Sequence, residues 1–80
     1  MNWNYRIVRV PNEWGEYEYG LYEVYYSDDG TPWARTEAPT TFVGDNSPEV
    51  VRIIATALED AMSRETLDDS VFDSVDNDDA

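Results

Sequence analysis

The chain has 80 residues, of which 18 are Asp or Glu and five are Arg, so its net charge at neutral pH is −13. It contains no Cys, His or Lys. This excludes disulfides, thiol nucleophiles and Cys or His zinc sites, and it removes the commonest general base. Such a negative surface repels nucleic acid and anionic membranes and attracts basic proteins, although it is also compatible with a role in solubility alone.

The length predicts a single domain with one compact core. The N-terminal segment lacks the apolar stretch of a signal peptide, and no apolar run approaches the roughly 18 residues of a membrane span. We therefore expect a soluble protein that does not contact a membrane. The absence of Cys fits a cytoplasmic location in a bacterial host.

Two segments near the N-terminus have the composition of β-strands. Residues 4–10 are rich in Tyr, Ile and Val, and they end at Pro11, which has no N–H to donate to a neighbouring strand. Residues 17–26 carry aromatic side chains on both faces, which predicts a central strand with one face on a helix and the other partly open. Gly20 within this strand indicates a bulge or a close approach of another group.

A hairpin turn and a third strand follow. Residues 27–30, Ser-Asp-Asp-Gly, are typical of a turn because Gly30 readily adopts a positive φ. Residues 31–37 then return as a strand, and Pro32 near its start favours a position at the edge of the sheet.

The helix has the clearest pattern in the chain. The link before it, residues 40–46, is expected to contribute Phe42 and Val43 to the core. Ser47 is the expected N-cap, with Pro48 at the first helical position. Apolar side chains then recur at helical spacing, which predicts that they pack on one face of the sheet; they are Val50, Ile54, Ala57, Leu58 and Ala61.

These elements predict an α+β fold in which a three-stranded antiparallel sheet packs on one C-terminal α-helix, in the order β-β-β-α. We expect residues 1–66 to form this single domain and residues 67–80 to form an acidic tail. The tail is rich in Asp, a poor helix former, which favours a disordered segment. The alternative is a tail that folds on a partner, with Phe72 and Val75 as its apolar anchors.

The residue types present do not favour enzyme chemistry. A calcium loop of the EF-hand type requires a Gly among regularly spaced carboxylates, and the C-terminal aspartates lack both features. A glycosidase-like pair of carboxylates needs a cleft that a domain this small scarcely provides. A phosphate-binding loop of the Walker type needs a Lys. We therefore expect no enzymatic activity, no cofactor and no metal site.

Protein recognition is the function that the composition favours. Tyr, Trp and Arg dominate interface hot spots, and acidic side chains around them select a basic partner. Arg6 and Arg9 are expected to pair with Glu18 or Glu23 across the sheet, so we expect no direct nucleic-acid binding. The predicted partner-binding residues combine acids with aromatic anchors; they are Glu13, Trp14, Glu16, Glu18, Trp33, Glu49, Glu59, Asp60, Asp68, Asp69, Phe72 and Asp73.

Several segments resemble a family of small, uncharacterised bacterial and phage proteins. The segments that carry the resemblance are Asn-Tyr-Arg-Ile-Val at 4–8, Tyr-Glu-Val-Tyr-Tyr at 22–26, Asp-Asp-Gly at 28–30 and Thr-Glu-Ala-Pro at 36–39. The resemblance covers about residues 3–62 and implies a sheet followed by a capped helix. Tyr22 departs from the family pattern, which has a His at that position. The family has no established activity, so the resemblance implies a fold and little more.

A weaker likeness, in size and charge alone, is to the anti-CRISPR proteins of phages. It implies that the carboxylates imitate nucleic-acid phosphates and occupy the basic channel of a CRISPR-Cas effector. We therefore expect an acidic inhibitor protein that acts by DNA mimicry. The alternative is a small bacterial regulatory or structural module that self-associates, as a homodimer, through an aromatic face of its sheet.

Overall fold

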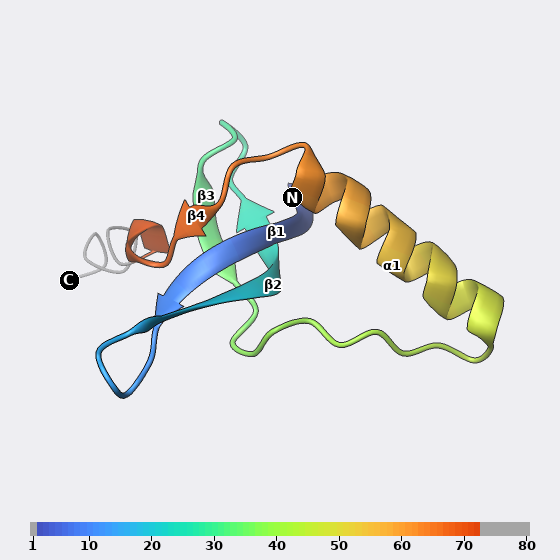
Figure 1. The fold of residues 1–80 in the computed structure, drawn as a ribbon. Helices are drawn as coiled ribbons and strands as arrows, with labels where there is room; N and C mark the ends of the chain where they lie inside the picture. Colours follow the sequence, from blue (N-terminus) through green and yellow to red (C-terminus); the bar gives the residue numbers. More distant parts are fainter. Residues whose placement is uncertain (1, 73–80) are drawn as a thin grey trace.

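The computed structural model describes residues 2–72, and Figure 1 shows a curved sheet with one long helix beside it. In chain order the elements are β1 (Asn2–Pro11), β2 (Tyr17–Tyr26), β3 (Pro32–Arg35), α1 (Ser47–Met62) and β4 (Leu67–Asp68). The strand order across the sheet is β3-β2-β1-β4. β1 and β2 pair antiparallel over their whole length, β3 pairs antiparallel with β2, and β4 pairs parallel with β1.

The fourth strand corrects the expected fold. In β4, Leu67 and Asp68 lie opposite Val8 and Arg9 of β1. The α+β class is confirmed, but the sheet is four-stranded and mixed instead of three-stranded and antiparallel, and α1 is not the last element. A two-residue strand has no recognisable periodicity, so only its pairing with β1 defines it.

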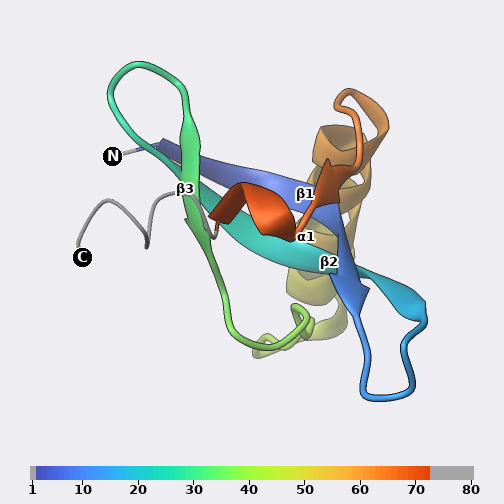
Figure 2. The same cartoon turned by 90° about the vertical axis from the view of Figure 1, so that its left-hand side faces the viewer.

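Different parts of the chain cover the two faces of the sheet. In Figure 2, α1 lies behind β1 and β2, whereas the short helical turn that follows β4 lies in front of them. α1 packs mainly on β1. The sheet face that was expected to be partly open is therefore covered by the C-terminal part of the described chain.

The main core cluster lies beneath this C-terminal cover. Its buried residues come from β1, from β2 and from the end of the described chain; they are Val8, Tyr22, Val24, Tyr26 and Phe72, with Val10, Leu67 and Val71 packed around them. The structure thus differs from the expected domain boundary at residue 66, because residues 67–72 form part of the sheet and core. Residues 73–80, which include Asp73 and Val75, lie outside the described residues.

The structure shows the close approach expected at Gly20 and the positive φ expected at Gly30. A Cβ atom at Gly20 would lie 3.0 Å from Cε1 of Tyr22, so this glycine allows the close approach of an aromatic ring. The register between β1 and β2 continues through Gly20 without a bulge. Gly30 has a φ of 87°, as the turn between β2 and β3 requires.

The N-cap of α1 is Asn46 instead of the expected Ser47. The Asn46 Oδ1 accepts a hydrogen bond from the backbone N–H of Glu49 at 2.9 Å, and Ser47 begins the helix. Asn and Ser are similarly good caps, so the local sequence did not distinguish these neighbours. No helix within residues 2–72 has the length and apolar composition needed to cross a membrane.

α1 buries less apolar surface than its sequence pattern suggested. Ala57 is the one helix residue that is buried, while Ile54 and Leu58 are exposed. In the link before the helix, Phe42 is half-buried, but Val43 is exposed and its expected core position was wrong. A large part of the aliphatic helix surface is therefore left uncovered by the described chain.

Candidate functional site

The loop between β1 and β2 is organised by Asn12. Its side-chain Oδ1 accepts hydrogen bonds from the backbone N–H groups of Trp14 and Glu16, both at 3.0 Å. The backbone N–H of Asn12 donates to the Glu16 carbonyl at 2.8 Å. Gly15 has a φ of 80°, which a residue with a side chain rarely adopts. These contacts fix the loop through its backbone and through Asn12, so the Trp14 side chain is not needed to hold it.

The side chains of this loop and of the start of β2 form one exposed surface, which we name the acidic hairpin. Its residues, all exposed, are Glu13, Trp14, Glu16, Tyr17, Glu18 and Tyr19. Trp14 keeps 74% of its surface accessible. The structure therefore brings together Glu13, Trp14, Glu16 and Glu18 from the predicted partner-binding set. In Figure 1 the hairpin extends from the end of the sheet farthest from α1.

Tyr17 and Tyr19 belong to this surface although they were not among the predicted binding residues. The period of two places both on one face of β2. Only the tertiary structure decides that neither the helix nor the C-terminal turn covers this end of the face.

The base of the acidic hairpin is fastened to β4 through Arg9. The guanidinium carbon of Arg9 lies 4.0 Å from the centroid of the Tyr17 ring, and its Nε donates a hydrogen bond to Asp68 at 2.9 Å. Hydrogen bonds from Ser70 and Arg9 lower the pKa of Asp68 to about 2. The same contact with Asp68 raises the pKa of Arg9. The expected pairing of Arg9 with a Glu of β2 was wrong, because Arg9 pairs with β4.

Asp69 and Phe72 also act within the fold. The Arg35 Nε donates to Asp69 at 2.6 Å, and this hydrogen bond raises the pKa of Arg35. The Arg35 guanidinium lies 4.7 Å from the centroid of the Tyr22 ring. Phe72 is only 8% exposed in the core. The assignment of Asp68, Asp69 and Phe72 to a partner surface is therefore corrected, because their interactions are already made inside the domain.

The remaining predicted residues lie apart from the hairpin. Trp33 is on β3 and is 38% exposed. Glu59 is exposed on α1, whereas Glu49 accepts the backbone N–H of Asp45 at 3.1 Å beside the helix N-terminus. The Asp60 carboxylate accepts a hydrogen bond from the backbone N–H of Tyr5 at 3.2 Å, and this bond joins the end of α1 to β1. The predicted set is therefore not one continuous surface.

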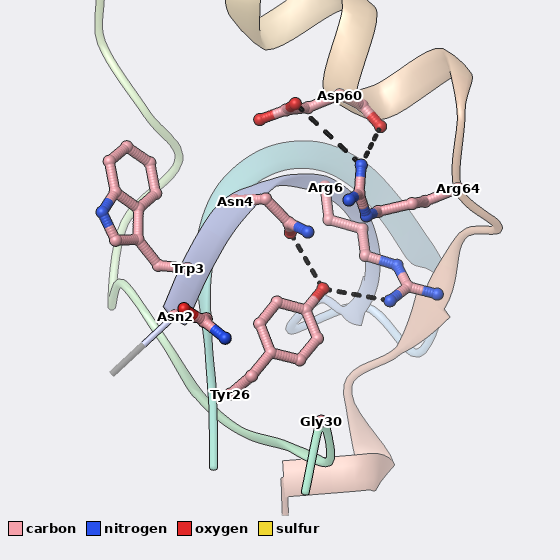
Figure 3. Close-up of a pocket in the computed structure, with 8 residues that line it drawn as sticks. All are labelled: Asn2, Trp3, Asn4, Arg6, Tyr26, Gly30, Asp60 and Arg64. Carbon is pink, nitrogen blue, oxygen red and sulfur yellow. Dashed lines mark hydrogen bonds and ion pairs between the residues drawn. The ribbon is translucent and has the colours of Figure 1, made fainter. Parts of the chain in front are cut away.

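A polar pocket of about 480 Å³ lies where β1, β2 and the end of α1 meet. Figure 3 shows the Tyr26 hydroxyl between Asn4 and Arg6. This hydroxyl donates to the Asn4 side chain at 2.8 Å and accepts from Arg6 at 3.1 Å. Arg6 also donates to the Glu65 carbonyl at 2.8 Å, and Arg64 is paired with Asp60. Because both guanidinium groups are already engaged, we interpret the pocket as a structural junction.

Two carboxyl groups of the described residues have strongly lowered pKa values. A general acid needs a carboxyl group with a raised pKa. Asp29 and Asp68 have large shifts in the opposite direction, to pKa values of about 2, and hydrogen bonds to the charged form are the main cause in both. Within residues 2–72, no three acidic side chains are grouped so as to hold a metal ion.

Comparisons with known proteins found no family model, no curated protein and no solved structure that matches this chain. The choice between the candidate surfaces therefore depends on their geometry and charge. Of the hairpin and the polar pocket, the acidic hairpin is the surface whose polar and aromatic groups are available to another molecule.

Proposed function

We propose that this chain is a non-enzymatic inhibitor protein whose acidic hairpin binds a basic, nucleic-acid-binding surface of a larger complex. The observation that carries the proposal is the exposure of Trp14 on a loop held by Asn12, among three glutamates. Trp is the residue type most enriched in interface hot spots. An aromatic side chain this exposed has no role in the core of its own domain.

The organisation of the loop supports tight binding. A loop that is already held by hydrogen bonds loses little conformational freedom when it docks, so more of the contact energy appears as affinity. Arg9 and its contact with Tyr17 hold the base of the hairpin in the same way. The hairpin therefore has the properties expected of a preorganised binding element.

The charge pattern supports a basic partner. Glu13, Glu16 and Glu18 are exposed and surround the aromatic side chains, and the whole chain carries a charge of −13. Long-range attraction of this kind accelerates association with a positive surface. A positive channel that normally holds nucleic acid matches the exposed glutamates of the hairpin and the negative charge of the whole chain. CRISPR-Cas effectors have such channels. We therefore propose a CRISPR-Cas effector as the partner and DNA mimicry as the mechanism.

The experiment is a competition assay between this chain and fluorescent target DNA for purified effector complexes of several CRISPR types. We expect displacement of DNA at about 50 mM salt and much weaker displacement at about 500 mM, because screening weakens the attraction. Trp14→Ala should weaken inhibition about 30-fold, as expected for a hot-spot residue worth about 2 kcal/mol.

Two triple variants separate the hairpin from net charge. Glu13→Gln, Glu16→Gln and Glu18→Gln remove three charges from the hairpin. Asp28→Asn, Glu37→Gln and Asp45→Asn remove three exposed charges elsewhere. The hairpin triple should lose inhibition and the other triple should largely keep it. Equal losses from both, or no displacement of DNA from any effector at low salt, would contradict the proposal.

A further inference from the structure

α1 presents an apolar stripe to solvent. Its residues, which we name the helix stripe, are Val51, Ala55, Leu58 and Met62. Their spacing of four, three and four residues places them on one face of the helix. Val51 is 62%, Leu58 58% and Met62 78% exposed. In contrast, Ala57, which lies on the other side of the helix, is fully buried against the domain.

The apolar surface extends beyond the helix stripe. A hollow of about 430 Å³ lies along Ala55, Leu58 and Met62. A second hollow of about 220 Å³ joins α1 to the sheet, and its lining includes Ile7, Leu21, Phe42 and Ile54 in addition to Leu58. Contiguous exposed apolar surface of this kind marks an interaction site in a soluble protein. The acidic hairpin lies at the opposite end of the molecule (Figure 1), so this surface is separate from it.

We infer that a second copy of this chain covers the helix stripe, with the two α1 helices antiparallel and a two-fold axis near Ala55. A two-fold interface requires a surface that is complementary to itself. Arg52 and Glu59 are both exposed beside the stripe, and they lie at nearly equal distances along the helix on either side of Ala55. In an antiparallel pair, Arg52 of each copy therefore faces Glu59 of the other.

The apolar residues satisfy the same symmetry. With the axis near Ala55, Val51 lies opposite Leu58 of the second copy, and Met62 lies opposite Pro48. The small side chain of Ala55 at the crossing point lets the two helices approach closely, while the larger residues on either side fill the space between them. One register thus matches both the charges and the side-chain sizes.

The distribution of charge favours this face for self-association. Residues 47–64 contain three acids, Glu49, Glu59 and Asp60, and two arginines, Arg52 and Arg64, so their net charge is −1. The chain as a whole carries −13, and nearly all of this excess lies outside the helix. Two copies that meet at α1 therefore bring together a segment that carries little of the net charge of the molecule.

The dimer should respond to salt in the opposite way from the proposed binding of a basic partner. Salt screens the repulsion between the two negative bodies, so dimerisation strengthens as ionic strength rises. Binding of the hairpin to a basic surface weakens under the same change. Because the two interactions depend on salt in opposite ways, failure of dimerisation through α1 can be distinguished from failure of the hairpin to bind a basic partner.

The first test is analytical ultracentrifugation of the full chain from about 1 µM to 1 mM, the range of weak association. We expect the mass to rise from 9.2 kDa towards twice that value, at lower concentration in about 500 mM than in about 50 mM salt. Leu58→Glu should weaken the dimer at least tenfold, because a charge enters its apolar centre. Trp14→Glu, which adds the same charge on the exposed hairpin, should have a small effect. A monomer at every concentration would overturn the inference.

A charge exchange tests the antiparallel register. Arg52→Glu and Glu59→Arg should each weaken the dimer about tenfold, since each replaces two attractive contacts by two repulsive ones. An equimolar mixture of the two variants should recover the affinity. In the mixed dimer the two substituted positions face each other with opposite charges. The unaltered Glu59 of one copy faces the unaltered Arg52 of the other, so both attractive contacts are present. Variants that do not recover on mixing would contradict the register.

Cysteine cross-linking tests the axis directly. The chain contains no Cys, so Ala55→Cys introduces a single thiol. A disulfide requires Cα atoms within about 7 Å, which holds near the two-fold axis. Ala55→Cys should cross-link readily under mild oxidation, whereas Thr56→Cys, exposed on a different side of α1, should not. Equal cross-linking of the two variants would place the axis elsewhere and overturn the inference.

Discussion

Asp68 shows how a half-buried acidic residue can be structural. Its carboxylate accepts hydrogen bonds from the Ser70 backbone N–H at 3.0 Å and from Arg9. Arg9 in turn lies over the Tyr17 ring. One carboxylate therefore connects β4 to β1 and to the base of the acidic hairpin. The number of acidic residues that remain for a partner is smaller than the composition alone suggests.

The pKa of Asp68 predicts a specific loss of stability in acid. Its pKa in the folded chain is about 2, below the ordinary value of 3.8. A lowered pKa stabilises the fold above about pH 4, and this contribution disappears as the pH falls towards 2. Asp68→Asn should therefore be less stable than the parent chain at pH 7, with a difference that shrinks between pH 4 and 2. Urea unfolding at several pH values measures this difference, and a constant difference would contradict the assignment.

Phe72 should be the most sensitive core position near the C-terminus. Removing a buried Phe side chain costs about 3 to 5 kcal/mol in transfer and cavity energy. We expect Phe72→Ala to lower the free energy of unfolding by about 3 kcal/mol, measured by urea denaturation. Val43→Ala, at a residue that is 75% exposed, should change it by less than about 0.5 kcal/mol. A small effect at Phe72 would mean that its side chain does not pack in the core.

At the scale of elements, polar contacts at both ends of α1 add to its packing on β1. Asn46 caps its first turn, and the side chain of Glu49 accepts the backbone N–H of Asp45. The Asp60 side chain fastens its last turns to β1. Ala57 is the one helix residue in the fully buried class, and these polar contacts add to the stability that the half-buried residues of the helix provide.

The cap residue is identified by two substitutions. Asn46→Ala should lower the free energy of unfolding by about 1 kcal/mol, because it leaves a helix N–H without its acceptor. Ser47→Ala should have a smaller effect, since Ser47 lies inside the helix. Thermal unfolding followed by circular dichroism compares the two variants. The reverse order would place the cap at Ser47.

At the scale of the whole molecule, the C-terminal part of the described chain completes the fold. Residues 67–72 add an edge strand to β1 and cover the face that carries Tyr22 and Tyr26. α1 covers part of the opposite face. The sheet is therefore covered on both of its faces. Each cover depends on contacts between segments that are far apart in the sequence.

Two truncations test this arrangement. A chain that ends at residue 66 loses β4 and Phe72, so we expect it to lose cooperative unfolding, since a domain this small has little stability to spare. A chain that ends at residue 72 keeps all the described contacts and should unfold cooperatively. Urea denaturation monitored by tryptophan fluorescence compares them. Cooperative unfolding of the shorter chain would show that the domain ends at residue 66.

The sequence by itself determined the features that depend on near neighbours. The alternation of residues 17–26 predicted β2 with its observed bounds, and the turn composition predicted the positive φ of Gly30. The clustering of Glu13, Trp14, Glu16 and Glu18 was also predictable, because they lie on one loop and the strand that follows it. Local periodicity and turn chemistry act within a few residues and need no knowledge of the rest of the chain.

Only the tertiary structure decided the features that depend on distant residues. Arg9 and Asp68 are 59 positions apart, and no local pattern indicates that this aspartate, with Asp69 and Phe72, belongs to the core domain. The exposure of Val51, Leu58 and Met62 likewise depends on how α1 lies against β1. Pairing and burial are set by which surfaces meet in space, because the free energy of contact is gained only when those segments come together.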